Sequence, residues 1–416
     1  MRHSLLLFTL LLSQLSAQIH ADFTVSQGGT SLGTFRVLLE HQKAPRTCAN
    51  FIGLASGKRA WIDSKNAAVR TNTPFYDGLI FHRLIHSFVI QGGANGKDGP
   101  GYTILDEYDQ TLRHSSAYVL SMAKGPFPNT GSSQFFITLR SATELDDKHS
   151  VFGKVISGTD IIDKFKNPGI FPTGAGDKPV TPIVMDSVVI SGPDYASFDL
   201  AAPSLRLPSV GNTTFIPERN TAASSFLLRF DRRPKTNYFF LQSTDLATWS
   251  NPQHLLSLDS FANYQFSYLS ITQPKFFVNT ATVQYEQIPE APADLVTGEK
   301  TVRIRYPNGS RIDLTLTPDF SVWEYADING SNLGDGFLSN VLWTDSVPSA
   351  GFLADTILQT HRIPLGRLGV TFDSPAGPEN LSSLNTQLSF HTETSGWLEE
   401  PSGTSRRRLP FELIQP

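Results

Sequence analysis

The chain has 416 residues but contains a single cysteine, Cys48, and only three methionines. A lone cysteine excludes a disulfide within the chain, so the fold has to be held together by its hydrophobic core. Cys48 lies in the helical pattern APRTCANFIGLASG, close to apolar residues. This setting favours a buried structural thiol over a reactive one.

Long apolar runs and an excess of charge of one sign are also missing. Beyond the N-terminal segment no stretch approaches the roughly 18 apolar residues of a membrane-spanning helix, so we expect no membrane span. The 34 Lys and Arg residues stand against 38 Asp and Glu residues, for a net charge of −4. That balance does not favour nucleic acid as a partner.

The sequence offers no pattern for a metal or a cofactor. His82, His86 and His114 have neither the spacing nor the carboxylate partners of a metal site, so we interpret them as structural or exposed. The loop GGANGKDGPG opens no helix and follows no strand–helix pattern, which argues against a dinucleotide-binding fingerprint. We therefore expect neither metal nor cofactor.

Phenylalanine, glycine and proline, by contrast, are abundant, at 29, 31 and 27 residues. This composition is typical of many strands joined by tight turns. At about 150 residues per domain, the length predicts two or three domains. We therefore expect a mainly β protein.

The first residues, MRHSLLLFTLLLSQLSAQIHA, have the pattern of a secretory signal peptide. Basic Arg2 and His3 precede an apolar core, and small residues follow it. We expect a signal peptide over residues 1–21, with cleavage after Ala17 or Ala21. The protein would then be exported to a bacterial periplasm or secreted.

One arginine occupies an unusual place in the segment FYDGLIFHRLIHSFVIQGG. Arg83 lies in a predicted strand between Phe81 and Ile85, two residues away on either side. Period-2 alternation puts all three on one face of the strand. Arginine is rarely placed among large apolar groups unless something requires it.

A second segment, GSSQFFITL, follows at residues 131–139. Gln134 and Phe136 share one face of the predicted strand, and the residues between them share the other. An arginine, a glutamine and a phenylalanine on strand faces suit a site that holds a small apolar ring. The polar groups would hydrogen-bond the amide beside that ring.

These two motifs, followed by LDDKHSVFGKVISGTDIIDKF, closely resemble the cyclophilin family of peptidyl-prolyl cis–trans isomerases. The resemblance runs from about Asp22 to Gly192, with the motifs in the family's order and spacing, and does not cover the rest. It implies an eight-stranded closed antiparallel barrel capped by two helices. The helical patterns at 45–55 and 159–166 agree with that fold.

The resemblance also implies a function and a set of site residues. A cyclophilin rotates X–Pro bonds in proline-containing polypeptides. Arg83 matches the arginine of the family's FHR motif, which acts on the prolyl nitrogen, and Gln91 matches the glutamine that steadies it. The residues implied to bind the substrate line an apolar wall, a polar rim and an adjoining shelf: Phe88, Val89, Gln91, Ala123, Lys124, Gln134, Phe136, Leu145 and His149.

Three positions depart from the family pattern. Val89 stands where a methionine is usual, and Lys124 replaces an asparagine that acts largely through its backbone. Glu144 occupies a position where many members carry a tryptophan that contacts cyclosporin. The resemblance therefore implies weak or no cyclosporin binding.

The C-terminal half is β-rich but carries no catalytic cluster. Residues 193–208 have the Pro, Ala and Ser content of a linker. We expect a small β domain over 209–287 and a C-terminal β domain over 288–416, built as one or two sandwiches or barrels. Alternating residues on either side of Pro307-Asn308-Gly309 predict a hairpin between 302 and 316.

Two functions remain open on the sequence. One is an exported isomerase that assists the folding of exported proteins. The other is a binding module, in which the barrel holds proline-containing peptides without important turnover. Arg83 favours the isomerase, because holding a peptide requires no donor at the prolyl nitrogen.

Overall fold

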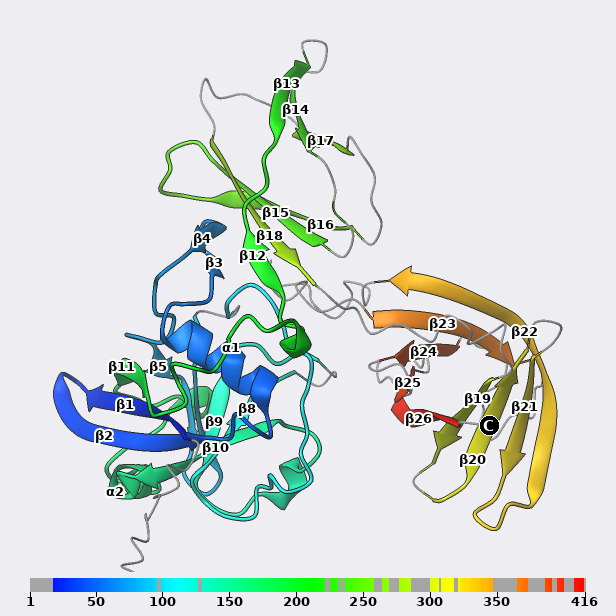
Figure 1. Ribbon diagram of the computed structural model, residues 1–416, viewed down its shortest axis with the longest axis horizontal. Coiled ribbons are helices and arrows are strands. Elements are labelled where there is room, and N and C mark those ends of the chain that lie inside the picture. The colour runs from blue at the N-terminus through cyan, green and yellow to red at the C-terminus, as the bar shows by residue number, and fades with distance from the viewer. Residues whose placement is uncertain are drawn as a thin grey trace, which may run out of the picture.

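The computed structural model is built almost entirely from strands (Figure 1). It describes residues 18–95, 99–125, 129–220, 225–230, 233, 236–257, 264–268, 277–285, 300–306, 308–317, 321–346, 365–372, 386–390, 395–399 and 408–414. Most of the expected signal peptide and the start of the expected C-terminal β domain, residues 288–299, lie outside these residues. No helix in the described part is long and apolar enough to cross a membrane.

The N-terminal sheet has nine strands in the order β5-β11-β1-β2-β10-β8-β9-β7-β6, and its neighbours pair antiparallel. Its strands are β1 (Ile19–Gln27), β2 (Thr30–Leu39), β5 (Ile80–Phe81), β6 (Arg83–Ile85), β7 (Val89–Gly92), β8 (Val119–Met122), β9 (Phe135–Thr138), β10 (Val151–Ser157) and β11 (Ile183–Ser191). The two edge strands, β5 and β6, are separated only by His82. The sheet is therefore closed by the chain itself, and the nine strands equal the expected eight when β5 and β6 are counted as one.

An aromatic core fills the barrel. Phe23 stacks on Phe35 with ring centroids 4.8 Å apart, and its edge meets Phe135 at 5.6 Å. Helix α1 (Pro45–Ala55) adds Phe51 to the same cluster. These rings are fully buried, and such packing makes the barrel a solid core rather than a pore.

Proline and glycine residues mark the ends of the two helices. Helix α1 has proline at its first position and is followed by Gly57 in the left-handed region at φ 70°. Helix α2 (Thr159–Lys164) follows Gly158, which is also left-handed at φ 72°. Cys48 of α1 is buried and its Sγ donates to the Phe152 carbonyl at 3.5 Å, so the expected structural thiol is confirmed.

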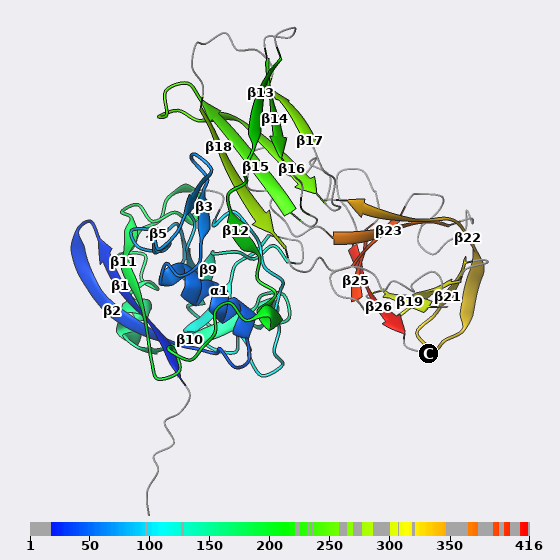
Figure 2. The same cartoon turned by 45° about the horizontal axis from the view of Figure 1, so that its top comes forward.

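Residues 193–208, expected as a linker, lie against the barrel instead (Figure 2); we call them the strap. The His41 ring contacts Asp194 Oδ2 at 3.1 Å and the Phe198 ring at 5.3 Å. Arg46 Nε donates to the Leu205 carbonyl at 2.7 Å, and the Leu205 side chain is buried. Proline content alone predicts an open tether, but the apolar residues between the prolines give the strap a surface to bury.

Further sheets follow the strap. One has the strand order β12-β18-β15-β16 and another β13-β14-β17. Their strands are β12 (Ser209–Gly211), β13 (Ile216–Asn220), β14 (Ser225–Phe230), β15 (Thr236–Ser243), β16 (Ser250–Ser257), β17 (Tyr264–Tyr268) and β18 (Phe277–Gln284). The four-stranded sheet approaches the small hairpin of β3 (Trp61–Asp63) and β4 (Ala68–Arg70), where Asn279 Nδ2 donates to the Asn66 carbonyl at 2.9 Å.

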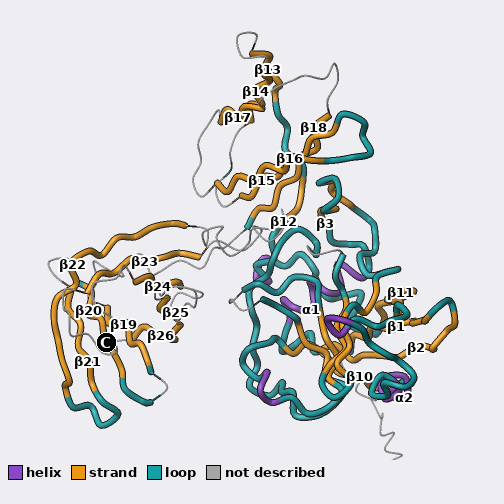
Figure 3. Tube along the Cα trace, turned by 180° about the vertical axis from the view of Figure 1, so that it is seen from behind, coloured by secondary structure: helices purple, strands orange, loops and turns teal. Residues whose placement is uncertain are grey.

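The last strands form a closed barrel of their own. They are β19 (Lys300–Arg305), β20 (Arg311–Leu316), β21 (Ser321–Ala326), β22 (Asn332–Ser346), β23 (Leu365–Phe372), β24 (Thr386–Phe390), β25 (Ser395–Glu399) and β26 (Arg408–Ile414). The expected hairpin is confirmed, because β19 pairs with β20 across 306–310. A separate core around Trp323 fills this barrel, and helices are drawn only in the N-terminal half (Figure 3).

The strap generates a first prediction, which compares two shortened proteins, residues 18–192 and residues 18–208. The shorter protein loses the buried Leu205, the Phe198 contact and the Asp194–His41 pair, together about 3 kcal/mol. We expect its thermal midpoint to be lower by about 5–10 °C in circular dichroism. Equal midpoints would show that the strap contributes nothing to the barrel.

Candidate functional site

A row of side chains crosses four neighbouring strands on the outer face of the N-terminal barrel. Arg83 of β6 is paired with Gln91 of β7, Gln91 with Phe136 of β9, and Phe136 with Ser121 of β8. Residues directly opposite each other on antiparallel strands project to the same side of the sheet. Pairing alone thus brings together residues that lie far apart in the sequence.

The prediction that Arg83 shares a strand face with Phe81 is wrong. Phe81 and Leu84 both lie in the barrel core, whereas the Arg83 side chain is 43% exposed. His82 interrupts the strand between β5 and β6, so the alternation shifts by one residue at that point. Arg83 therefore leaves the core face that Phe81 occupies.

The guanidinium of Arg83 is held by a residue that the sequence did not indicate. Its Nε donates to Asp177 Oδ2 at 3.2 Å, and both side chains are more than two-fifths exposed. Gln91, expected to steady Arg83, instead donates from Nε2 to Gln134 Oε1 at 3.0 Å. The described contacts thus leave the terminal nitrogens of Arg83 available to a ligand.

Glycine shapes the end of β7. Gly93 has φ 81°, in the left-handed region, and a Cβ there would lie 2.6 Å from the Ser133 carbonyl oxygen. Only glycine fits so close an approach of two backbones. Ser133 Oγ in turn donates to the Gly93 carbonyl at 2.8 Å, which fixes β7 beside the start of β9.

The apolar wall is built around Phe136, which is almost fully buried. His149 meets its ring edge-on with centroids 5.4 Å apart, and His149 Nδ1 contacts the Met122 carbonyl at 3.0 Å. The His149 amide donates to the Leu145 carbonyl at 3.2 Å, which holds the two residues close together although Asp146 is extended and Asp147 is left-handed, so the segment between them is a turn and not a helix. Phe136 and His149 therefore face one another.

The remaining predicted residues surround this wall. The Ala123 amide donates to the Gln134 carbonyl at 2.9 Å, which joins the expected shelf to the row. Val89 is buried opposite Thr138 on β9, and Phe88 is half-buried under the Arg140 guanidinium at 5.1 Å. Phe88 has no contact with Phe136 among the ring pairs of the described residues, so it lies further out on the wall.

His114 is a residue that sequence reasoning missed as part of the site. It is fully buried, and its ring stacks on Phe136 with centroids 5.8 Å apart and planes 18° apart. Its Nδ1 lies 2.8 Å from Asp146 Oδ1 and its Nε2 lies 3.0 Å from Ser121 Oγ. In the sequence His114 is a lone histidine, and nothing in its neighbours indicates that its ring would pack against Phe136.

Burial sets the charge of both imidazoles. Burial lowers the pKa of His114, although the neighbouring Asp146 carboxylate acts in the opposite direction. Burial likewise lowers the pKa of His149 below its ordinary value. Both rings are therefore neutral at pH 7. The wall around Phe136 is uncharged, and the permanent charge of the row belongs to Arg83.

Lys124 is less free than a surface lysine. Its Nζ lies 2.6 Å from Asp106 Oδ2 and 3.0 Å from the Tyr108 hydroxyl, and both charged side chains are only about a tenth exposed. Asp106 also accepts from the Asn129 amide at 2.9 Å. The ammonium group is thus held by the separate segment that carries Asp106 and Tyr108, which leaves the backbone around Lys124 to meet a ligand.

The described residues contain no cluster of three or more His, Cys, Asp or Glu side chains that could hold a metal ion. What the row offers instead is a partly exposed guanidinium, a glutamine pair and an apolar wall. Such groups can hold an apolar ring and donate a hydrogen bond. The Ser121 hydroxyl does lie beside the His114 imidazole, but both side chains are fully buried, and Ser121 Oγ donates to the Ser150 carbonyl at 3.1 Å. This pair therefore presents no nucleophile to a ligand on the row.

Comparison with known proteins identifies a family for this part of the chain. The family model of cyclophilin type peptidyl-prolyl cis-trans isomerase matches residues 22–190. The chain is 38% identical over 167 residues to peptidyl-prolyl cis-trans isomerase A of Mycobacterium tuberculosis, which covers 39% of this chain and 89% of that protein.

Two further relatives give the same result. Peptidyl-prolyl cis-trans isomerase B of Streptomyces anulatus is 35% identical over 181 residues, covering 42% of this chain and 98% of that protein. A Schizosaccharomyces pombe peptidyl-prolyl cis-trans isomerase is 41% identical over 160 residues, with coverage of 37% and 90%. Each match accounts for well under half of the chain.

Proposed function

Because this chain belongs to the cyclophilin family and is a peptidyl-prolyl cis–trans isomerase, we propose that Arg83 is its catalytic donor. The barrier to rotation about an X–Pro bond is about 18–20 kcal/mol and comes from the double-bond character of the C–N bond. In the twisted amide the prolyl nitrogen recovers its lone pair. A donor aimed at that nitrogen stabilises the twisted form and neither planar isomer, which is the condition for a faster reaction.

The single observation that carries this proposal is the row of Arg83, Gln91 and Phe136. Phe136, backed by the two neutral imidazoles, would receive the proline ring. Gln134, with its side chain linked to Gln91 at 3.0 Å, and the Ala123 backbone would hold the substrate main chain. The guanidinium of Arg83 is planar, and its terminal nitrogens bond no described residue, so they can donate to the amide beside the ring.

Replacing Arg83 tests this assignment. We expect Arg83→Ala to lower kcat/KM for X–Pro isomerisation by about 10²–10³-fold, the typical loss for one transition-state donor. The measurement is a proline-isomerisation assay on a short peptide with the full chain. Circular dichroism should remain unchanged, because the side chain is 43% exposed and its pair with Asp177 is too exposed to add much stability.

Arg36→Ala is a matched control. Arg36 is 44% exposed on β2 and is also paired with an aspartate, Asp22, at 2.7 Å. Its loss should leave the rate unchanged. Equal rates for wild type and Arg83→Ala would contradict the catalytic assignment. If neither protein accelerated the reaction, the barrel would act as the binding module considered above.

Weak or absent cyclosporin binding is the second part of the proposal. Glu144 lies where many family members place a tryptophan, and its carboxylate accepts from Arg140 at 2.7 Å. Arg140 also lies over the Phe88 ring at 5.1 Å, so a charged pair, and not an aromatic ring, stands at Glu144 beside this part of the wall. A single aromatic contact is worth about 1 kcal/mol, or roughly fivefold in affinity.

Cyclosporin inhibition checks this part. Glu144→Trp should bind the drug about fivefold more tightly than the wild type. Glu144→Gln removes the charge without adding a ring and should change little. Tight inhibition of the wild type would show that other contacts replace the missing indole.

The third part concerns location: we propose an exported isomerase that acts on proline-containing exported polypeptides. The support is the signal-like N-terminal sequence. The two cleavage positions differ in their effect on the barrel, because β1 begins at Ile19 and both Ile19 and Ala21 are fully buried. Cleavage after Ala21 would remove buried core residues, whereas cleavage after Ala17 leaves β1 complete.

N-terminal sequencing of the exported protein tests this choice. The mature chain should begin at Gln18. A mature chain that begins at Asp22 would contradict the role of Ile19 in the barrel. Retention of Met1 by protein recovered from the cells would contradict export itself.

A further inference from the structure

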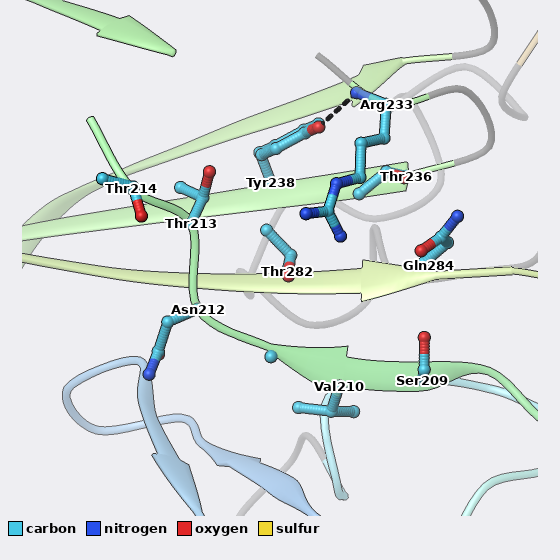
Figure 4. Close-up of a pocket in the computed structure, with 11 residues that line it drawn as sticks. Ser209, Val210, Asn212, Thr213, Thr214, Arg233, Thr236, Tyr238, Thr282 and Gln284 are labelled. Carbon is cyan, nitrogen blue, oxygen red and sulfur yellow. Dashed lines mark hydrogen bonds between the residues drawn. The ribbon is translucent and has the colours of Figure 1, made fainter. Parts of the chain in front are cut away.

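A polar cavity of about 380 Å³ lies in the four-stranded sheet, well apart in sequence from the isomerase row (Figure 4). Its volume falls in the range of small-molecule sites. It is lined by Ser209, Val210, Gly211, Asn212, Thr213, Thr214, Arg233, Thr236, Tyr238, Thr282 and Gln284. Hydroxyl and amide groups therefore predominate where small-molecule sites are usually apolar.

The cavity follows from strand register. Ser209 on β12 is paired with Gln284 on β18, which is paired with Thr236 on β15. Two residues along, Gly211, Thr282 and Tyr238 form a second row in the same way. Period-2 alternation puts both rows on one face of the sheet. The intervening residue of β18, Val283, is fully buried in the core on the other face.

Glycine leaves the space open. Gly211 stands at the end of the second row, and a Cβ built there would have its nearest contact, Thr282 Oγ1, at 3.7 Å. No backbone strain requires glycine, because Gly211 has no positive φ. The missing side chain thus widens a cavity that a larger residue would fill.

One charge enters the cavity. The guanidinium of Arg233 points between the strands toward Thr282, while its backbone amide donates to the Tyr238 hydroxyl at 2.6 Å (Figure 4). No carboxylate is among the described residues that line the cavity, and Arg233 forms no ion pair with any described residue. Arg233 is exposed, so its guanidinium lies where a ligand can reach it, and a cation beside neutral hydroxyls and amides attracts an anion.

We propose that this cavity binds a sugar acid, with the carboxylate on Arg233 and the ring hydroxyls on the two polar rows. Serine, threonine, asparagine and glutamine side chains both donate and accept hydrogen bonds, as sugar hydroxyls do. Val210 alone among the lining residues is aliphatic, so the cavity has no wall for an apolar peptide side chain. The cavity therefore gives the C-terminal half a ligand of its own.

Calorimetric titration of the full chain with D-galacturonate tests the proposal. D-galactose is the matched probe, since it differs only in carrying a hydroxymethyl group in place of the carboxylate. We expect D-galacturonate to bind about fivefold more tightly than D-galactose, because a pair with an exposed arginine contributes up to about 1 kcal/mol. Acetate, which has the charge without the hydroxyls, should compete poorly.

Three variants locate the site. Arg233→Gln should weaken D-galacturonate binding by about fivefold, because it removes the charge. Gly211→Val should weaken it by about tenfold or more, because it fills the space. Arg305→Gln changes an exposed arginine of β19 and should leave binding within about twofold. Unchanged circular dichroism and isomerase rate would show that each variant is folded.

Four outcomes would overturn the proposal. The proposal is wrong if D-galacturonate does not bind, or if D-galacturonate and D-galactose bind equally tightly. Binding that survives Arg233→Gln would place the ligand elsewhere. Acetate or inorganic phosphate that displaces D-galacturonate at equal concentration would identify a general anion site rather than one for a sugar acid.

Discussion

Closure of the N-terminal barrel through residues 80–85 is the constraint on which the isomerase site depends. Strand β5 pairs with β11 at one edge of the sheet, and β6 pairs with β7 at the other. The single residue between them, His82, shifts the alternation, so Phe81 enters the core while Arg83 leaves it. Without that shift Arg83 would point into an aromatic core, where an unpaired charge costs several kcal/mol.

Once Arg83 faces outward, the antiparallel register supplies the rest of the row. Gln91 and Phe136 are brought beside it by pairing, and buried groups then support the wall from behind. His114 is the clearest of these, because it touches Phe136 on one side and Asp146 and Ser121 on the other. The apolar wall is therefore fixed from behind by His114 and Ser121, which are fully buried.

Sequence patterns predicted what depends on local spacing. The barrel, its two helices, the buried Cys48 and the 300–316 hairpin were all accessible from periodicity, turn residues and the resemblance. The partners of Arg83 and Lys124 were not, because Asp177 lies on a distant loop and Asp106 belongs to a segment with no regular pattern. The proline content of residues 193–208 predicted a linker and not a segment packed against the barrel. Composition alone does not show which surface an apolar residue can bury.

We propose that the row of Arg83, Gln91 and Phe136 catalyses rotation about the X–Pro bond and does not merely hold proline. Exchange NMR spectroscopy on a short Ala-Pro peptide with a small amount of the full chain measures both events at once. We expect cis–trans exchange peaks that are absent without protein, together with shifts of the Gln91 and Phe136 amides. Shifts at these amides without any exchange peaks would contradict this proposal.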